Sequence, residues 1–521
     1  MILSDASSLP EDLGRFNVMH TRKNKAQSTA VTDSGRTSQI ARRSLGGVTW
    51  MIFQTLASKS FGFIGQIILA RLLMPHDFGL VGMAYAAAAI PNILRQSGVP
   101  QILVQKRRSF ARWAQAAFWM EIALGIAAGI LMLLAAPYAA LAFHAPQLIP
   151  IMDIIAPGVA ITALFAVPTA RLMQDMRFRE LAMIGLGYNI IAMVLSIVLA
   201  SLGWGVYSFV IPLPVVGALR AIALWMAAPT RIKFNAQFHR WPHLVGKSSL
   251  LMGAVVFRTV SRIAEMSCLR AFASVAIVGD YFFASNLSTQ ISQVFSTNVA
   301  GVLYPALTSM ENQINRQTAA FLRAANLVAL AGMPLCVLES LLARPLLTLL
   351  YGSKWHAAIL PLELLSLGAA FMLLVEPSLN FILAQGRFRF QLTWATGSAL
   401  VYLPLALIAA WAGGAAILAV AVSVFWAFAA PLLVRQAIGP GGGTWGDVAA
   451  LFLRPAAMAA AAAAPWIGVR LLAAPMTLPI WGNILCGSIS FLLIYTSLSV
   501  WFRSTELLAL WHTVRQQSAG S

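Results

Sequence analysis

Lys and Arg cluster on alternate connections between the long apolar segments of this 521-residue chain. One set holds most of the cations outside those segments: the tail before residue 44 and the connections near 106–112, 171–179, 231–247, 316–323, 387–389, 435–454 and 503–515. The other set carries only Arg71, Arg270, Arg344, Lys354 and Arg470. Because positively charged loops resist translocation, the cation-rich side is expected to face the cytoplasm. The alternation predicts a polytopic membrane protein with both termini inside the cell.

The composition excludes an ordinary soluble domain. Hydrophobic residues make up 59% of the chain and charged residues only 10%, which leaves too little polar surface to cover a water-soluble protein of this length. The net charge of +19 could suggest a nucleic-acid partner. However, the cations lie in short clusters between apolar runs and form no continuous basic domain, so we expect no nucleic-acid partner.

A spanning helix needs about 20 mostly apolar residues, and the chain contains about fourteen segments that qualify, although twelve spans remain an alternative. In the first half they are 47–70, 79–104, 113–136, 148–170, 181–202, 205–228 and 249–272. In the second half they are 277–307, 324–349, 359–384, 391–411, 414–434, 449–471 and 479–502. Glycines at 203 and at 413–414 mark two turns at which a hairpin could be misjudged.

The connections do not favour an enzyme. After residue 46 no loop is much longer than about twenty residues, whereas a membrane glycosyltransferase or polymerase usually needs an external loop with catalytic carboxylates or histidines. No phosphate-binding loop of the G-x-x-x-x-G-K-[ST] type occurs, and Cys268, Cys336 and Cys486 give no disulfide framework. We expect no metal site either, because Trp241 and Pro242 interrupt the helix that would align His239 with His243. The prediction is a protein that is not an enzyme and has no cofactor.

Cations inside the predicted spans are the most informative residues. A charge at the centre of a membrane helix costs about 2.5–3.5 kcal/mol on insertion scales, so it usually faces a cavity or a partner. Five cations lie within spans, namely Lys59, Arg95, Arg220, Arg258 and Arg262. Arg220 is close enough to a helix end to reach the interface. The other four are candidate substrate-binding residues of a cationic cavity.

Uncharged polar residues form stripes on the first and eighth predicted helices. Gln66 follows Lys59 on the first, and Asn286, Gln290 and Gln293 share a face of the eighth. These amides are candidates for the lining of the same cavity. The alternative is structural, since amides also hold membrane helices together by hydrogen bonds between them. Arg262 with Glu265 is a second candidate for such pairing.

A group of Arg and Lys side chains is suited to a diphosphate, because guanidinium forks match phosphate oxygens and ammonium adds a point charge. Nearby amides and hydroxyls would suit sugar hydroxyls, so a phosphate-linked glycan fits both. Glu121, Glu339 and Glu376 lie inside spans and are candidates for coupling transport to protons or sodium ions. Pairing within the structure is their more frequent role.

The chain also shows signs of internal duplication. Leu69-Ala70-Arg71 ends the first span and Gly82 opens the second, while Cys268-Leu269-Arg270 ends the seventh and Gly279-Asp280-Tyr281 opens the eighth. These matches recur at an offset near 200 residues. They predict two halves in parallel orientation.

The stretch Arg43-Ser-Leu-Gly-Gly-Val-Thr-Trp50, the run from Ile67 through Leu-Met-Pro-His-Asp-Phe-Gly to Leu80, and Gly98-Val-Pro-Gln-Ile-Leu-Val-Gln105 resemble the opening of Wzx-type polysaccharide flippases. These belong to the multidrug, oligosaccharidyl-lipid and polysaccharide exporter superfamily. The motifs cover only about residues 43–108. Span count, orientation and duplication agree with the resemblance over the remainder.

The resemblance implies an all-α fold of about 14 (12 to 14) transmembrane helices in two bundles around a central cationic cavity. The expected divisions are a disordered basic cytoplasmic tail (1–45), an N-terminal bundle of spans 1–6 (46–228), a cytoplasmic linker (229–248), a C-terminal bundle of spans 7–12 (249–434), two additional spans (435–503) and a cytoplasmic tail (504–521).

The implied function is transfer of undecaprenyl-diphosphate-linked oligosaccharide units from the inner to the outer face of the bacterial inner membrane, by alternating access. Expected partners are this lipid-linked oligosaccharide, membrane lipids, a polysaccharide polymerase and other assembly proteins. Three alternatives stay open: a flippase for the peptidoglycan precursor, a drug or small-molecule exporter of the same superfamily, and a membrane glycosyltransferase or polymerase. Proton or sodium coupling is an expectation without a residue assignment from the motif.

Overall fold

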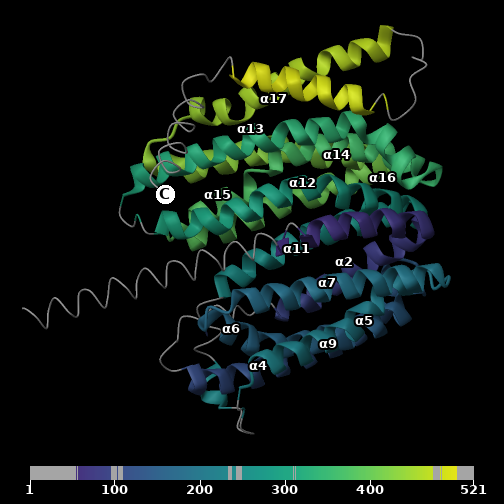
Figure 1. The fold of residues 1–521 in the computed structure, drawn as a ribbon, viewed down its shortest axis with the longest axis vertical. Coiled ribbons are helices and arrows are strands. Elements are labelled where there is room, and N and C mark those ends of the chain that lie inside the picture. Colours follow the sequence, from purple (N-terminus) through teal and green to yellow (C-terminus); the bar gives the residue numbers. More distant parts are fainter. Residues whose placement is uncertain are drawn as a thin grey trace, which may run out of the picture.

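A computed structural model describes residues 54–55, 57–95, 103, 110–230, 232, 237–241, 249–308, 310, 313–472, 482 and 484–500. Within these ranges the chain forms helices and no strands. The helices run side by side along a common direction (Figure 1). The two predicted tails and most of the predicted linker lie outside the described residues.

The first group of helices occupies one half of the molecule. It comprises the helix over 57–72, α2 (Pro75–Arg95), α4 (Phe110–Ala142), α5 (Leu148–Thr162), α6 (Ala166–Gln174), α7 (Phe178–Ser201), α8 (Tyr207–Val210) and α9 (Pro212–Ala227). A 3-10 turn, η2 (Ala163–Phe165), joins α5 to α6. Helix α4 packs against α2 and α5, and α9 packs against α5 and α7.

The second group follows the short turn η3 (Phe238–Arg240) and fills the other half (Figure 1). It comprises α11 (Ser249–Phe272), α12 (Val275–Thr308), α13 (Ile314–Leu346), the π-helical turn η4 (Leu347–Tyr351), η5 (Ser353–Ala358), α14 (Ile359–Met372), α15 (Val375–Ala384), α16 (Phe388–Ile438), η6 (Gly439–Gly441), α17 (Trp445–Leu472) and the helix Ile484–Val500. Helix α2 also packs against α11 and α12, so these three helices form the junction between the groups.

Each of the predicted membrane segments overlaps one of these helices. By length and composition, 8 of the described helices are long and apolar enough to cross a membrane. Helices 57–72, α2, α11 and α12 are outside that set. All four carry charged or polar residues that the sequence placed at the cavity, including Lys59 on 57–72, Arg95 on α2 and Gln290 on α12.

The doubtful turn at Gly413–Gly414 joins two antiparallel helices. A continuous helix would separate Tyr402 from Phe425 by about 34 Å, yet their ring centroids lie only 4.9 Å apart. The two rings are equally far along the chain from the glycine pair, where the backbone leaves the helical conformation. Segments 391–411 and 414–434 are therefore two separate helices, as predicted.

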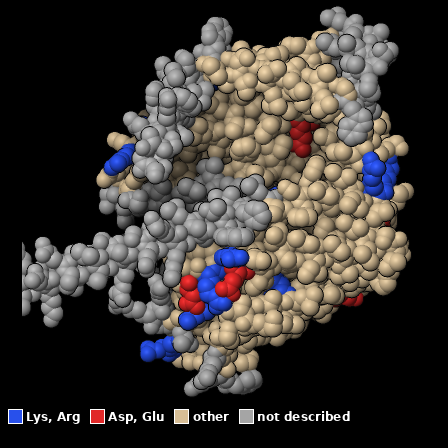
Figure 2. Space-filling model, viewed as in Figure 1, with Lys and Arg blue, Asp and Glu red and all other residues tan. Residues whose placement is uncertain are grey.

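Large apolar side chains cover the outside of the helices. Leu134, Leu141, Leu400, Met226 and Phe428 are each more than 60% exposed, far beyond what a water-soluble monomer tolerates in one continuous surface. Figure 2 shows a face that is uncharged over most of its area, with Lys and Arg gathered mainly toward the ends of the helices. The protein is therefore a multi-pass membrane protein whose solvent is lipid.

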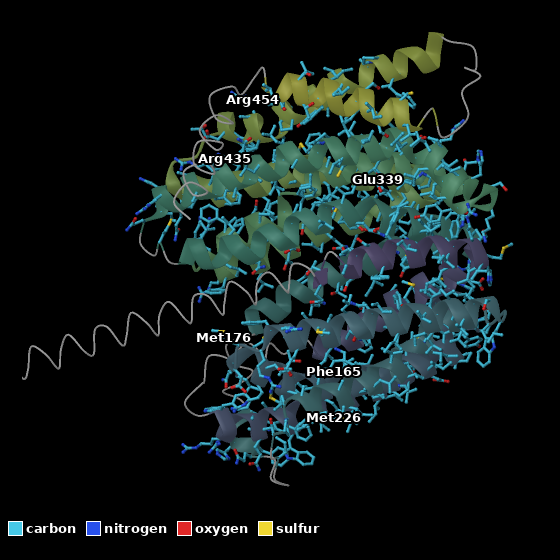
Figure 3. The ribbon with its side chains drawn as sticks, in the orientation of Figure 1. Phe165, Met176, Met226, Glu339, Arg435 and Arg454 are labelled. Carbon is cyan, nitrogen blue, oxygen red and sulfur yellow. The ribbon has the colours of Figure 1, made fainter. Side chains whose placement is uncertain are left out.

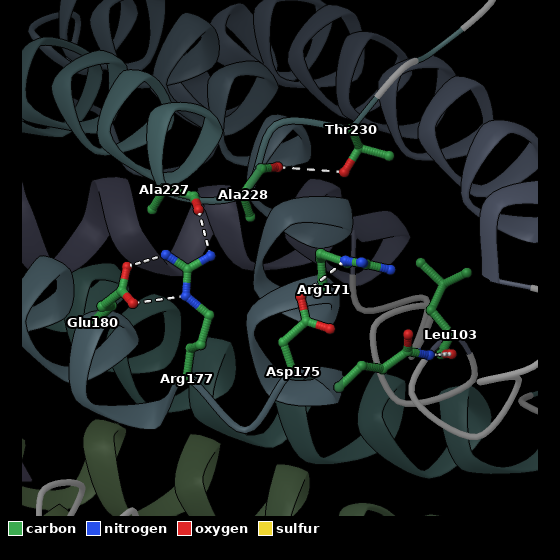
Figure 4. A network of polar contacts seen from close by, with 9 residues as sticks. Leu103, Arg171, Asp175, Arg177, Glu180, Ala227, Ala228 and Thr230 are labelled. Carbon is green, nitrogen blue, oxygen red and sulfur yellow. Dashed lines mark hydrogen bonds and ion pairs between the residues drawn. The ribbon is translucent and has the colours of Figure 1, made fainter.

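The connection between α6 and α7 shows how a charged turn is fixed to the helix ends (Figure 4). Arg177 donates to both carboxyl oxygens of Glu180, through Nε at 2.6 Å and Nη2 at 2.5 Å. Its Nη1 donates to the carbonyl oxygen of Ala227 at the end of α9, at 2.8 Å. Arg171 pairs with Asp175 at 3.0 Å. These ion pairs are partly exposed, so each contributes little to stability. Only the hydrogen bond from Arg177 to Ala227 joins this turn to α9.

We predict that Gly414→Ala destabilises the protein, because Gly414 has φ +62° and ψ −141°, a region that is essentially restricted to glycine and costs other residues about 1–3 kcal/mol. No neighbouring atom would obstruct the added methyl group. Thermal unfolding of the purified protein should show a lower melting temperature.

Gly397→Ala is the matched control. Gly397 lies inside α16 with open space around it, and alanine favours a helix interior. Equal melting temperatures for the two variants would contradict the hairpin assignment.

Candidate functional site

Helices α2 and α12 touch at two glycines, Gly79 and Gly279, that are related by the 200-residue offset. A Cβ at Gly79 would overlap the carbonyl oxygen of Val275, and a Cβ at Gly279 would overlap that of Pro75. Gly79 and Gly279 are equivalent positions of the two halves, and so are Pro75 and Val275, so the two contacts are the same contact with the halves interchanged. The predicted duplication is thus visible as a local twofold relation in which the backbones touch.

Arg71 extends from the end of helix 57–72 into the other group of helices. Its Nε donates to the carbonyl oxygen of Leu350 and its Nη2 to that of Leu349, each at 2.7 Å. Both carbonyls belong to η4, at the end of α13, where helical amides no longer satisfy them. The cation also complements the partial negative charge of a helix C-terminus. Arg71 therefore caps a helix of the opposite group.

Lys354 makes the reciprocal contact. Its Nζ donates to the carbonyl oxygens of Arg71 at 2.8 Å and Leu73 at 2.5 Å, and the indole Nε1 of Trp355 donates to the carbonyl of Ala70 at 2.9 Å. These carbonyls lie at the C-terminal end of helix 57–72. Each group of helices therefore caps the other.

Arg270 forms a weaker contact of the same kind. It ends α11 as Arg71 ends the first helix, and its Nη2 donates to the carbonyl of His144, between α4 and α5, at 3.2 Å. Its Nη1 donates to Ala273 at 3.1 Å. The arginines at the ends of the first and seventh spans thus reach corresponding connections of the opposite group.

Aromatic side chains fill the space behind these hydrogen bonds. The ring of Phe78 from α2 lies edge-on to Trp355 and Phe283 of the second group, with centroids 4.9 and 5.5 Å away. Trp355 and Phe283 stack at 4.1 Å, and Tyr351 contacts Phe283 at 5.0 Å. We call Arg71, Phe78, Gly279, Lys354 and Trp355 the seal, because together they close one end of the junction.

Polar side chains face one another across the junction on the other side of the seal. Gln290 Nε2 on α12 donates to Gln66 Oε1 at 2.6 Å, and farther from the seal Lys59 Nζ donates to Gln293 Oε1 at 3.4 Å. Gln66 and Gln290 are partly buried, whereas Lys59 and Gln293 are exposed. We call these four residues the polar seam. Its exposure increases away from the seal, so the junction opens toward the other end.

The seam brings together the first and eighth helices, whose polar stripes the sequence singled out. Asn286 lies on α12 as predicted, but its Nδ2 donates to the carbonyl of Phe282 on the same helix, at 2.9 Å. Arg95 ends α2, and Arg258 and Arg262 lie on α11. The side chains of these three arginines are outside the described residues, so their binding role stays a prediction. Arg220 stacks over Phe165 and Tyr188.

The three candidate acids lie on different elements. Glu121 is buried on α4, and Glu376 is in the first turn of α15. Each of these two has a further polar or electrostatic interaction. Glu339 lies on α13, and its Oε2 atom is buried without a hydrogen-bond partner. Figure 3 places Glu339 toward the end of the helices opposite to Arg435 and Arg454.

Glu265 is a partly buried acid whose carboxyl oxygens have partners. It accepts hydrogen bonds from the hydroxyl groups of Tyr281 on α12 and Tyr402 on α16, the former at 3.2 Å. The carboxyl group thus joins α11, α12 and α16. The predicted Arg262 to Glu265 pair stays untested, but two tyrosines that the sequence did not single out bind this acid.

The seal is the part of the site that the sequence analysis missed. Arg71, Arg270 and Lys354 entered it only as the few cations on the cation-poor side. Their rarity there, and the repeated Leu-Arg at the ends of the first and seventh spans, were the available signals. Within the described ranges no three His, Cys, Asp or Glu side chains gather as a metal site.

Comparison with known proteins gives a family match. The model of a family described as "Polysaccharide biosynthesis protein" matches residues 68–360. The chain is similar to the succinoglycan biosynthesis transport protein ExoT of Rhizobium meliloti, with 24% identity over 67% of this chain and 70% of the relative. It is also similar to the teichuronic acid biosynthesis protein TuaB of Bacillus subtilis, with 23% identity over 77% and 82% of the two chains.

Solved structures share the fold. The lipid II flippase MurJ in an inward closed conformation superposes with a TM-score of 0.69 at 14% identity, over 87% of this chain and 98% of MurJ. An outward-facing multidrug transporter of the MATE family in the MOP superfamily superposes with a TM-score of 0.53 at 15% identity, over 77% and 96%. The all-helical fold with two bundles that the sequence predicted is that of this superfamily.

We predict that Arg71→Ala opens the seal. The variant loses two hydrogen bonds from a charged donor, each worth about 1.5–3 kcal/mol, so open states should become at least about tenfold more populated. Val278→Cys, fully buried beside Gly279, reports opening through its rate of alkylation by a water-soluble maleimide. Native Cys268 and Cys486 are first replaced by Ser, while Cys336 is buried.

Gly279→Ala should accelerate alkylation in the same way, because its methyl group has no room beside Pro75. Gly187→Ala is the control, since Gly187 has open space around it. Similar rates in all of these variants would mean that the seal does not limit access.

Proposed function

Because this chain belongs to the family of polysaccharide biosynthesis proteins, we propose that it is a Wzx-type flippase that moves polyprenyl-diphosphate-linked oligosaccharide units across the membrane for surface polysaccharide synthesis. The family model matches more than half of the chain, and relatives are named for the transport or synthesis of succinoglycan, lipopolysaccharide and teichuronic acid. These names support a substrate that is a precursor of a surface polysaccharide. The bacterial inner membrane is the site at which such precursors are assembled.

One observation carries the mechanism: the junction between the two groups of helices is sealed at one end and polar and exposed toward the other. Proteins that move a large polar headgroup through a bilayer need a polar path that is never open to both sides at once. The polar seam provides amides for sugar hydroxyls and a lysine for phosphate. The seal provides a closure that consists of hydrogen bonds and stacked rings, which can break without unfolding a helix.

The orientation of this state follows from charge. Arg71, Arg270 and Lys354 lie at the seal, and the charge pattern assigns them to the outer side of the membrane. Met176, Arg435 and Arg454, near the cation-rich connections, lie toward the opposite end (Figure 3). In this assignment the seam opens to the cytoplasm, from which it would accept the lipid-linked glycan. An inside-negative potential then assists export of the anionic headgroup by about 2.3 kcal/mol per charge per 100 mV.

The peptidoglycan precursor is the second candidate substrate. The similarity to MurJ supports the fold that such a flippase uses, and the diphosphate headgroup is chemically the same. The two candidates differ in the glycan, which the uncharged amides of the seam would contact. Coupling to a polysaccharide polymerase and to other assembly proteins is part of the proposal only for the first candidate.

Transport in proteoliposomes tests the proposal. The purified protein should transfer a polyprenyl-diphosphate oligosaccharide between leaflets, measured as the fraction accessible to an added phosphatase, and should transfer the peptidoglycan precursor more slowly. Cells that lack the gene should accumulate the oligosaccharide in the inner leaflet. Formation of a new glycosidic bond during incubation would instead identify a glycosyltransferase or polymerase, and equal transfer of a lipophilic drug would identify an exporter.

Lys59→Ala should reduce the initial rate of transfer about tenfold, because it removes one charge-assisted contact with the diphosphate, while Lys59→Arg should retain most of it. Arg454→Ala, on an exposed face of α17, is the matched control for loss of a cation. Arg258→Ala with Arg262→Ala tests the predicted clamp. Full transfer by the double variant at normal protein levels would remove these arginines from the site.

A further inference from the structure

Three polar atoms are buried without hydrogen-bond partners on neighbouring elements of the second group. They are Glu339 Oε2 on α13, Ser366 Oγ on α14 and Tyr351 Oη at the end of η4. Ser366 faces the carboxyl group of Glu339, and Tyr351 is near enough to experience its charge. Buried polar atoms are nearly always satisfied in native proteins, so a group of three is a departure that needs a physical cause.

The surroundings of Glu339 disfavour a charge. Cys336, one turn earlier on α13, and Tyr351 of η4 are the titratable groups close to it. Among the described side chains, no charged group of α12, α14 or α17 acts on the carboxyl group, and no cation pairs with it. Glu339 is partly buried within a membrane helix, where a carboxylate without a cation is more costly than the neutral acid. The sealed state is therefore compatible with a protonated Glu339.

Glu265 in the same group of helices shows the contrast. Its two carboxyl oxygens accept hydrogen bonds from Tyr281 and Tyr402, so it is held as a satisfied acceptor. The hydroxyl group of Ser366 faces the carboxyl group of Glu339, but Glu339 Oε2 has no hydrogen-bond partner. The carboxyl group of Glu265 thus joins three helices, whereas Oε2 of Glu339 has no hydrogen-bond partner.

Glu339 lies on the helix that leads to the seal. Helix α13 continues into the π-helical turn Leu347–Tyr351, and the carbonyls of Leu349 and Leu350 in that turn accept the hydrogen bonds of Arg71. Tyr351, which is near enough to Glu339 to experience its charge, also contacts Phe283, which stacks on Trp355. Single π turns are frequent at functional sites because their backbone can shift by one hydrogen bond. Solvation of the acid would move the segment that holds Arg71 and the aromatic rings.

We propose that Glu339, with Ser366 and Tyr351, is a proton-binding site that controls the seal. With the proton bound, the carboxyl group is neutral and the seal closes over it. When the proton leaves, the carboxylate requires water or a rearranged hydroxyl shell, and the π-helical turn gives up its contacts with Arg71. A proton taken up from the outer side thus permits the outer end to close again after the glycan has left. The inference rests on the proposed transport cycle and assigns its coupling ion.

The test measures the seal without any substrate. Spin labels at Met74→Cys and His356→Cys, both exposed at the sealed end in opposite groups, report the separation of the groups in lipid nanodiscs, with Cys268 and Cys486 replaced by Ser. In the otherwise native chain a longer distance should gain population as the pH rises, by up to about tenfold per pH unit for one proton. Glu339→Gln should keep the short distance at every pH.

Two controls make the result specific. Glu265→Gln removes the charge of a second partly buried acid in the same group, and this variant should titrate like the parent. Ser366→Ala and Tyr351→Phe remove groups that could stabilise the carboxylate, so each should move the midpoint of opening to higher pH. These two variants decide the matter if Glu339→Gln does not fold.

The proposal is overturned if the parent shows one distance at all pH values, if Glu339→Gln titrates like the parent, or if both hydroxyl variants leave the midpoint unchanged. A distance change that follows sodium concentration at constant pH would replace the proton by sodium. The outcome is independent of the transport assay: failure to flip the glycan with a titrating seal rejects the proposed function alone, and flipping without titration rejects the proton site alone.

Discussion

The reciprocal capping of helix ends across the junction is the interaction on which this state of the protein depends. Arg71 satisfies the last carbonyls of the α13 segment, and Lys354 and Trp355 satisfy those of helix 57–72. A carbonyl without a partner in lipid costs several kcal/mol, so neither group of helices can end at this point without the other. The same contacts can be replaced by water when an aqueous phase enters from the sealed end. These hydrogen bonds are therefore strong while water is excluded from the junction, and water replaces them readily once it enters.

Internal duplication explains why Arg270 repeats the contact of Arg71 with the two halves exchanged. Gly79 and Gly279 occupy equivalent positions, and each meets the backbone of the opposite helix. Arg71 and Arg270 end equivalent helices, and each reaches a connection between the third and fourth long helices of the other half. Two similar halves that meet about a local twofold relation can form the same contact at two equivalent places, as these glycines and arginines do. The two copies differ in strength, since Arg71 donates two hydrogen bonds of 2.7 Å to the opposite half, whereas Arg270 donates one of 3.2 Å.

Two partly buried acids in the second half differ in their neighbours rather than in their depth. Glu265 has two phenolic donors and joins three helices. Glu339 faces similar groups without bonding to them through Oε2 and lies behind the turn that holds the seal. The hydrogen-bond geometry of a carboxyl group, which depends on how helices pack, decides whether it acts as a fixed acceptor or as a group that responds to protons.

The sequence by itself determined the membrane environment, the helices and the two-part architecture. Apolar length, cation placement and the 200-residue repeat are local or periodic properties, and the bilayer admits few folds that satisfy them. It also placed polar stripes on the first and eighth helices, whose residues Gln66 and Gln290 bond to each other. Tertiary structure alone decided which residues close the junction. The acceptors of Arg71 and Lys354 are backbone carbonyls of segments nearly 300 residues away, and every residue type carries the same carbonyl, so no pattern of side chains could have identified them.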